Sequence, residues 1–280
     1  MAINWFPGHM VKTKREIKEN LKLVDAVIEI RDARIPYSSS NPDVDDLCKG
    51  KPRLILLNKS DLTDSNITKR WIKSLTKEEV RAIEVNSLKG DGLKNIKPIL
   101  IDMLKEKHDR LRKKGLVKIT TRVMVVGIPN VGKSTFINKL AKNNIAKTGD
   151  RPGVTRSKQW IKTSMGIELM DTPGILWPKF EDENVALNLA FTGAIKDEIM
   201  DTEELALKLV ERLQNIHPDL LKARYKLDSL EESPLENLDN IARKRGAILS
   251  GGVINYNRIS SILLDEFRGG KIGKISLETP

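Results

Sequence analysis

Eight residues in the middle of the chain have the composition of a phosphate-binding loop. Residues 127–134 read GIPNVGKS, in which two glycines let the backbone curl closely. Such a loop places backbone N–H groups around a phosphate at the start of a helix, where the helix dipole favours an anion. We expect Lys133 to reach the β- and γ-phosphate oxygens and Ser134 to bind Mg²⁺. The other nucleotide contacts expected around this loop are Asn130, Val131, Gly132 and Thr135.

Two further segments fit the switch regions of a nucleotide hydrolase. The sequence DTPG follows an expected strand and begins at Asp171, 37 residues after Ser134. We expect Asp171 to hold Mg²⁺ through water and the Gly174 N–H to bind the γ-phosphate. Thr155 is the candidate threonine of the first switch, whose hydroxyl would bind Mg²⁺ and whose main chain would sense the γ-phosphate and the attacking water. The alternative for Thr155 is an ordinary loop threonine.

The sequence NKSD at residues 58–61 fits recognition of guanine. The carboxylate of Asp61 can accept from guanine N1–H and N2–H₂ together, whereas adenine would leave it unpaired. The stem of Lys59 can cover the face of the base, and Asn58 opens the motif. A second loop follows the next expected strand and is expected to close over guanine O6 through its backbone. This loop consists of Asn86, Ser87 and Leu88.

The order of these motifs is unusual, because NKSD stands about seventy residues before the phosphate loop. In an ordinary GTPase the phosphate loop comes first, so the chain is expected to be circularly permuted. Short apolar runs alternate with helical patterns, which indicates βαβ units and a parallel sheet. The expected strands span residues 26–30, 53–57, 82–85, 123–126 and 167–170. The fold class is therefore α/β.

The chain divides into three parts by its pattern. Residues 1–22 form a basic arm with a helix, residues 23–178 form the permuted nucleotide-binding domain, and residues 179–280 form an all-α C-terminal domain. A break in the pattern after residue 178 marks the last boundary, since we expect only helices beyond it. The expected helices span residues 10–23, 65–76, 96–111, 135–142, 184–195, 202–215, 236–246 and 256–267.

The composition of the chain indicates the cellular compartment in which we expect it. No apolar run reaches the length of about 18 residues needed to span a bilayer, and the N-terminal residues lack the apolar stretch of a signal peptide. The single cysteine, Cys48, cannot form an internal disulfide. We therefore expect a cytoplasmic protein with no membrane partner.

Basic residues are concentrated in the N-terminal two-thirds of the chain. The net charge is +11, to which residues 181–280 contribute −5 and the rest +16. This asymmetry favours a polyanionic partner such as RNA, and the alternative is a solvated surface. The candidate RNA-binding residues are Lys12, Lys14, Arg15 and Lys18 near the N-terminus and Arg243, Lys244 and Arg245 in the helical domain.

These motifs together resemble the circularly permuted GTPases of ribosome assembly, and most closely the ribosome biogenesis GTPase A (YlqF) group. The resemblance extends over essentially the whole chain, and the permuted order makes it specific. The matching segments are WFPGHM from Trp5, DARIP from Asp32, NKSD, GIPNVGKST, GDRPGVT, DTPGILWPKFED and RGAILSGGVINY. The resemblance implies a Rossmann-like sheet with flanking helices followed by a helical domain. It also implies GTP hydrolysis stimulated by the large ribosomal subunit, with GTP or GDP and Mg²⁺ as cofactors.

The residue that positions the attacking water is not evident from the motifs. Ile175 stands directly after DTPG, where many small GTPases carry a glutamine, and it cannot hydrogen-bond water. One candidate is a K⁺ ion held at Asn130, which resembles the asparagine of potassium-activated GTPases; the alternative is that Asn130 only shapes the loop. The other candidate is His9, since a neutral imidazole could orient water near pH 7. His9 could equally be a surface or RNA-contacting residue.

Two classes of function remain open. In the first, the protein is a GTPase that binds the precursor of the large ribosomal subunit through rRNA and couples hydrolysis to a late maturation step and to its own release. In the second, it is an RNA-binding assembly scaffold for which GTP is mainly a structural ligand. A tRNA-modifying GTPase is a weaker third interpretation. We expect the protein to be a monomer when it is off the ribosome.

Overall fold

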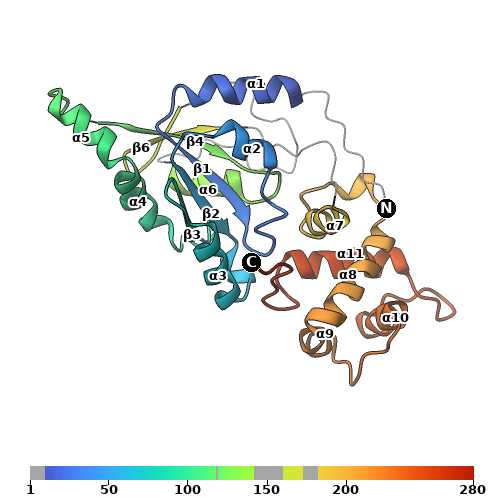
Figure 1. Ribbon diagram of the computed structural model, residues 1–280. Helices are drawn as coiled ribbons and strands as arrows, with labels where there is room; N and C mark the ends of the chain where they lie inside the picture. The colour runs from blue at the N-terminus through green and yellow to red at the C-terminus, as the bar shows by residue number, and fades with distance from the viewer. Residues whose placement is uncertain (1–9, 118, 142–159, 173–181) are drawn as a thin grey trace. The chain divides into compact units, whose positions relative to one another are not determined.

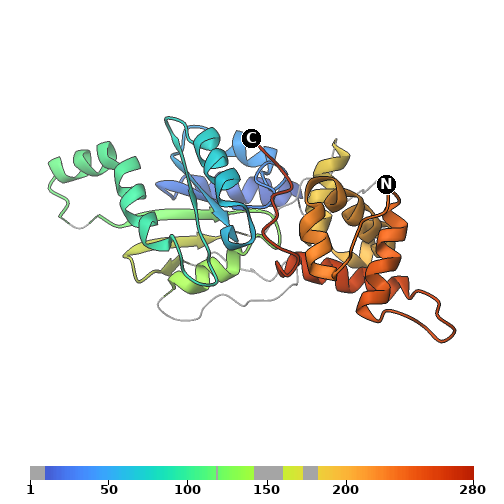
Figure 2. The same ribbon diagram turned by 90° about the horizontal axis from the view of Figure 1, so that it is seen from below.

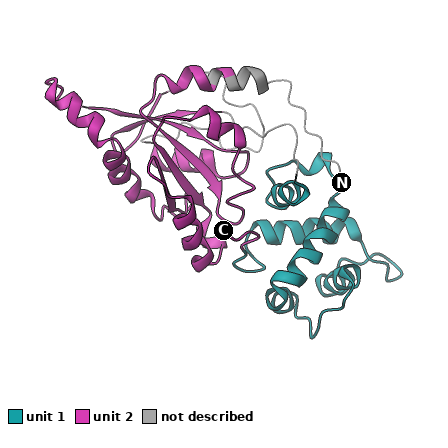
Figure 3. Ribbon diagram, viewed as in Figure 1, with its two compact units in different colours: residues 1, 182–275 teal, residues 2–181, 276–280 magenta. Residues whose placement is uncertain are grey.

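The computed structural model describes residues 10–117, 119–141, 160–172 and 182–280 (Figure 1). These residues belong to two compact units. The sheet unit comprises residues 2–181 and 276–280, and the helical unit comprises Asp182–Ile275 (Figure 3). The sequence predicts a helical domain that runs to residue 280, but the structure assigns the last five residues to the sheet unit. The two units are described separately below.

The sheet unit is built around a single sheet. In the described part of the chain this sheet has six strands in the order β3-β2-β1-β4-β6-β5. All neighbouring strands run parallel except β5, which is antiparallel to β6. The strands are β1 (Ala26–Asp32), β2 (Arg53–Asn58), β3 (Val80–Glu84), β4 (Thr121–Val126), β5 (Trp160–Lys162) and β6 (Ile167–Asp171). The predicted parallel sheet is confirmed, and β1 is buried along its whole length because it lies inside the sheet.

Helices and short 3₁₀ turns connect the strands of the sheet unit. They are α1 (Met10–Leu21), α2 (Pro42–Leu47), η1 (Ser60–Leu62), α3 (Ser65–Leu75), η2 (Leu93–Asn95), α4 (Ile96–Met103), α5 (Lys105–Lys113) and α6 (Lys133–Leu140). Ile17 and Leu21 of α1 pack against Val27 of β1, and Trp71 of α3 packs against Ile55 of β2. Val27 pairs with Arg53, so strand alternation puts Val27 and Ile55 on the same face of the sheet. Helices α1 and α3 therefore cover one face together.

The helical unit is organised around its longest helix. Its elements are α7 (Glu183–Phe191), η3 (Asp197–Ile199), α8 (Thr202–Ile216), α9 (Pro218–Tyr225), α10 (Pro234–Arg245) and α11 (Tyr256–Arg268). Helix α8 packs against α7, α9, α10 and α11 (Figure 2), and buries Leu205, Leu209 and Leu213 at the i, i+4 spacing of one helical face. Asp201 begins α8 by accepting from the backbone N–H groups of its first turn. None of the described helices has the length and apolar character that a bilayer span requires.

The structure differs from the sequence prediction in four elements. Helix α2 was not expected, although Pro42 at its first turn and the capping side chain of Asn41 are start signals. The short edge strand β5 and helix α9 were also missed. The expected helix over residues 96–111 is two helices, because α4 ends at Met103 and α5 begins at Lys105, with Leu104 between them. The other expected strands and helices in the described residues are confirmed within a few residues at their ends.

Candidate nucleotide-binding site

The residues expected to bind the nucleotide gather at the carboxyl edge of the parallel strands. Asn58 ends β2, Asp171 ends β6, and the phosphate loop follows β4 directly. The loop at residues 86–88 comes directly after β3 and Val85. Ligands bind at this edge in open α/β sheets, because the loops that leave the strands converge there. The parallel pairing thus brings together motifs that are separated by about seventy residues in the sequence.

The phosphate loop has the conformation that its glycines and asparagine allow. Asn130 and Gly132 have φ angles of 60° and 91°, in the left-handed region that Gly adopts freely and Asn tolerates. Helix α6 begins at Lys133, so the N–H groups of the loop lie at a helix N-terminus. The curvature at Asn130 is consistent with the view that this residue shapes the loop.

Lys133 reaches across the loop to the end of β6. Its Nζ donates to the backbone oxygen of Thr172 and lies 3.6 Å from Oδ1 of Asp171. Burial lowers the pKa of Lys133, and the Asp171 carboxylate opposes that shift. The Thr172 hydroxyl donates to the backbone oxygen of Val125 at 2.7 Å, which fixes the end of β6 against β4. The lysine and the carboxylate that the sequence assigns to phosphate and metal are therefore neighbours.

The buried side-chain amide of Asn58, at the end of β2, joins the phosphate loop to the 86–88 loop. Its Nδ2 donates to the backbone oxygen of Val131 at 2.7 Å, and its Oδ1 accepts from the backbone N–H of Ser87 at 2.9 Å. The residue is 2% exposed, so both bonds form away from water. Asn58 is predicted to contact the nucleotide, and in the structure its amide holds the phosphate loop and the 86–88 loop in register.

Gly132 has no room for a side chain because Asn58 lies directly beside it. A Cβ built at Gly132 would lie 2.3 Å from Nδ2 of Asn58. Gly127 is similarly confined, since its Cβ would lie 2.7 Å from the backbone oxygen of Ile30. The glycines of the loop are therefore required by close packing as well as by conformation.

Lys59 links the guanine motif to the phosphate loop and to a buried ion pair. Its Nζ donates to the backbone oxygen of Asn130 at 2.7 Å and lies 3.0 Å from Oδ2 of Asp32. Arg34 binds the same carboxylate with Nε to Oδ1 at 3.0 Å and Nη2 to Oδ2 at 2.8 Å. Burial alone would raise the pKa of Asp32, but the charges of Arg34 and Lys59 outweigh it and hold the pKa well below its usual range.

The sequence motifs alone assign no role to Asp32 and Arg34. Both lie in the DARIP segment that contributes to the family resemblance, and both are almost fully buried. A signal was available, because Asp32 is a charged residue at the end of β1, on the edge of the sheet where ligands bind. Charged residues at such a place are expected to be paired, since an unpaired buried charge is costly.

Asp61 remains accessible for a base. It lies in η1, its side chain is 33% exposed, and Nζ of Lys89 is 3.5 Å from its Oδ2. Ser60 fixes the turn by donating its hydroxyl and its N–H to the backbone oxygen of Val85. On the opposite loop Leu88 is largely exposed, and its backbone oxygen accepts from Lys139 at 3.3 Å. Asn86 holds that loop by accepting from the Lys89 N–H at 2.9 Å.

The arrangement of oxygen donors fits a hard cation beside the phosphates. Ser134 follows Lys133 in the first turn of α6, and Nζ of Lys133 lies 3.6 Å from Oδ1 of Asp171. Hydroxyl and carboxylate oxygens are the ligands that Mg²⁺ prefers, with water and phosphate oxygens completing its shell. Ser134 and Asp171 are thus suited to hold Mg²⁺ when a nucleotide is bound.

Three of the expected catalytic residues lie outside the described residues. They are His9, Thr155 and Gly174. Among the N-terminal candidates for RNA contact, Lys12 and Lys14 belong to α1, while Arg15 and Lys18 of the same helix are exposed. These four positions therefore share one helix, as the helical spacing predicts.

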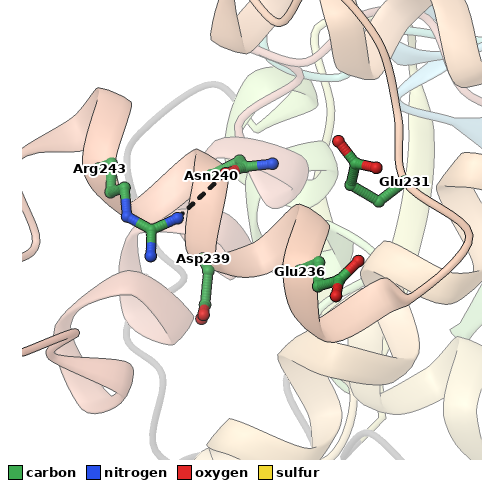
Figure 4. A pocket seen from close by; sticks show the side chains of 5 residues that line it. All are labelled: Glu231, Glu236, Asp239, Asn240 and Arg243. Atoms are coloured by element: carbon green, nitrogen blue, oxygen red, sulfur yellow. Dashed lines mark hydrogen bonds between the residues drawn. The ribbon is translucent and has the colours of Figure 1, made fainter.

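The basic triplet of the helical unit has mixed surroundings. Arg243 and Lys244 are exposed at the end of α10, but Arg245 pairs with Glu266 at 2.9 Å. Arg243 donates to Asn240 at 3.1 Å and lines an open hollow of about 360 Å³ (Figure 4). The other residues lining this hollow are Asn240, Glu231, Glu236 and Asp239. Three carboxylates beside one guanidinium disfavour phosphate inside the hollow, so only the outer surface of the triplet suits RNA.

We predict that Gly132→Ala abolishes binding of guanine nucleotides, because the new methyl group would push Asn58 away from the phosphate loop. We expect the dissociation constant for GDP, measured with a fluorescent analogue, to rise by at least about a hundredfold. Gly50→Ala is the matched control, since Gly50 also has a positive φ of 77° but nothing within 4 Å of the added Cβ. Equal GDP affinities for the two variants would contradict the close-packing argument.

Comparison with known proteins agrees with this geometry. A family model described as a 50S ribosome-binding GTPase matches residues 122–239. Ribosome biogenesis GTPase A of Bacillus cereus is 50% identical over 280 residues, which is 100% of this chain and 95% of that protein. The Thermotoga maritima protein of the same name is 35% identical over 278 residues, covering 99% of this chain and 95% of its own length.

Solved structures extend the comparison to the fold. The structure of GNP-bound YlqF from Thermotoga maritima aligns with a TM-score of 0.68 and 31% identity, and covers 96% of this chain and 98% of that chain. A GDP-bound YlqF structure aligns with a TM-score of 0.66 and 32% identity, over 95% and 99% of the two chains. The α/β sheet, the permuted order of the motifs and the helical C-terminal region are shared features. The chain therefore belongs to the ribosome biogenesis GTPase A family of circularly permuted GTPases.

Proposed function

We propose that this GTPase binds the precursor of the large ribosomal subunit and couples GTP hydrolysis to a late step of its maturation and to its own release. The observation that carries the proposal is the joining of guanine motif and phosphate loop by the bonds from Asn58 to Val131 and from Lys59 to Asn130. These bonds support a working nucleotide site in a permuted chain. The names of the relatives support the ribosomal context. We further propose that the protein acts in the cytoplasm as a monomer off the ribosome.

Guanine is selected by the residues that follow β2. Asp61 accepts from guanine N1–H and N2–H₂, the stem of Lys59 covers the base, and the backbone of residues 86–88 closes over O6. Because the Asp32 carboxylate and the Asn130 oxygen both hold Nζ of Lys59, its position is fixed before the base arrives. Preorganisation of this kind lowers the entropic cost of binding.

The phosphates are held by the loop after β4 and by Lys133. The backbone N–H groups of residues 130–135 surround the β-phosphate, and Lys133 moves from the Thr172 oxygen to the β- and γ-phosphate oxygens. Ser134 and Thr155 would hold Mg²⁺ directly and Asp171 through water, and the ion would offset negative charge on the transferring phosphoryl group. The N–H of Gly174 senses the γ-phosphate.

Hydrolysis requires a group that orients water in place of Ile175. Two candidates are kept. Asn130 holds K⁺ against the phosphates, so that added positive charge stabilises the transition state. Alternatively, His9 orients the water when the protein is docked, which would explain stimulation by the ribosomal subunit.

The second switch is also the start of the path to the helical unit. The DTPG sequence begins at the end of β6, and the helical unit begins at Asp182, a few residues beyond it. Loss of the γ-phosphate at Gly174 can therefore act on the helical unit through the chain itself. In this proposal the nucleotide state sets how the protein holds the particle.

The RNA surface is proposed to lie on α1 and at the end of α10. Arg15 and Lys18 are exposed on α1, and Lys12 and Lys14 belong to the same helix. Arg243 and Lys244 supply exposed positive charge in the helical unit, and Arg245 is paired with Glu266. Clusters of this kind bind structured RNA through its backbone and shape rather than its base sequence.

We predict that isolated large ribosomal subunits stimulate GTP turnover in K⁺ buffer by at least about tenfold, because docking completes a water-positioning group. Phosphate release with and without subunits measures this directly. If hydrolysis drives release from the particle, the Thr155→Ala variant would keep its nucleotide but lose hydrolysis. The variant would then remain bound to the particle in sedimentation experiments. A scaffold would instead support normal particle maturation with the same variant, and that outcome would favour the alternative function.

We predict faster turnover in K⁺ than in Na⁺ at equal ionic strength, if the cation acts through Asn130. Asn130→Gly separates the two roles of this residue, because glycine adopts the observed φ of 60° without strain but offers no side-chain ligand. The variant should lose the advantage of K⁺ and keep its affinity for GDP. Retention of the full K⁺ advantage by Asn130→Gly would leave loop curvature as the role of Asn130.

We predict that binding to large-subunit rRNA weakens steeply with salt, because the contacts are to phosphates. The double variant Arg15→Gln, Lys18→Gln should reduce the slope of log affinity against log salt by about one to two. The matched control is Lys69→Gln, Arg70→Gln, which removes two exposed charges from α3. Identical slopes for both double variants would exclude α1 from the RNA surface.

A further inference from the structure

The last residues of the chain return to the sheet unit and lie along the turn that follows β1. Ser276 and Leu277 are buried there, and the Leu277 N–H donates to the backbone oxygen of Arg34 at 2.9 Å. The segment belongs to the same compact unit as the nucleotide site (Figure 3). These contacts tie residues 276–280 to the turn after β1.

Glu278 anchors this terminal segment on three sides. Its carboxylate accepts from the backbone N–H of Tyr37 at 2.7 Å and of Ser38 at 3.1 Å, and from the Ser38 hydroxyl. Its backbone oxygen accepts from Nε1 of Trp71 at 3.2 Å. A carboxylate that accepts from consecutive backbone donors makes charge-assisted bonds, which are about twice as strong as neutral ones. The turn from residue 34 to residue 38 is thus held by the end of the chain.

The same turn holds Asp32. Arg34, whose oxygen accepts from Leu277, binds the Asp32 carboxylate with its own N–H at 3.0 Å and with its guanidinium. The Asp32 N–H donates to the hydroxyl of Ser39, and that hydroxyl also donates to the Ile35 oxygen at 2.6 Å. These bonds close the turn on itself, so a shift of its backbone would displace the Asp32 carboxylate.

Asp32 in turn fixes Lys59. The Asp32 Oδ2 lies 3.0 Å from Nζ of Lys59, which donates to the Asn130 oxygen of the phosphate loop at 2.7 Å. A continuous series of polar contacts therefore runs from residues 277 and 278 through Arg34 and Asp32 to Lys59 and the phosphate loop. Each member of this network constrains the next, so a displacement at one end acts on the other.

We propose that Leu277 and Glu278 are positioning residues of the guanine site, which hold the turn after β1 so that Asp32 keeps Lys59 over the base. The inference rests on the proposed function, in which residues 58–61 bind guanine. In this arrangement the terminal segment slows the release of GDP and GTP and touches neither nucleotide. It makes Leu277 and Glu278 determinants of nucleotide affinity.

The test is the rate of dissociation of a fluorescent GDP analogue from the full-length protein. Glu278→Gln keeps the shape of the side chain and removes its charge, so dissociation should accelerate by roughly three- to tenfold, with little change in association. A chain ending at Ser276 should show a larger effect. The matched control is Glu78→Gln at an exposed site of the sheet unit, which should release GDP at the wild-type rate.

A double-mutant cycle separates positioning from a general loss of stability. Lys59→Met removes the ammonium and keeps most of the stem, so Glu278→Gln should have no further effect on GDP release in that background. Additive effects of the two substitutions would overturn the proposed route through Lys59. Unchanged GDP release by Glu278→Gln in a wild-type protein that binds GDP would overturn the inference itself. Failure of the wild-type protein to bind GDP would overturn the proposed function instead.

Discussion

The amide of Asn58 is the contact on which the nucleotide site depends. It joins the phosphate loop to the loop after β3, from a strand that lies two positions away from β4 in the sheet. Because both its polar atoms are buried and bonded, loss of either partner would leave an unsatisfied group away from water. The contact also explains the loop composition, since only glycine fits at position 132 beside Nδ2 of Asn58.

The parallel sheet explains why motifs in a permuted order still form one site. The residues of a parallel sheet that bind ligands need only to leave their strands at the same edge, and the order in which the chain visits the strands is free. In this chain β1, β2 and β3 come first and carry the guanine motif, while β4 and β6 follow with the phosphate loop and the metal-side carboxylate. Rotation of the sequence therefore preserves the site but changes which chain segments lead away from it.

The local motifs could be predicted from the sequence because their chemistry is local. NKSD, GIPNVGKS and the strand before each were recognised from short spacings, and the structure brings them together. The roles of Asn58 and Asp32 could not be read in the same way. Asn58 has the expected residue type, but only the three-dimensional packing shows that its amide forms hydrogen bonds with Val131 and Ser87.

Contacts between segments that are far apart in the sequence could not be predicted from it. Glu278 meets Tyr37 and Ser38 across about 240 residues, and no periodicity or composition signals such a pairing. Short elements could not be predicted from the sequence for a related reason. Strand β5 has three residues and α2 has six, so their formation depends on the neighbours that they pack against. The break at Leu104 likewise lies within a continuous helical pattern.

The return of the chain end to the sheet unit means that the helical unit is an insertion and not an appendage. Residues 182–275 leave the sheet unit after β6, and residues 276–280 rejoin it. A chain shortened at residue 181 would lose the helices and, with them, the covering of the turn after β1. An autonomous sheet unit therefore has to be made by excising the insertion and rejoining the flanking segments, because truncation alone also discards part of that unit.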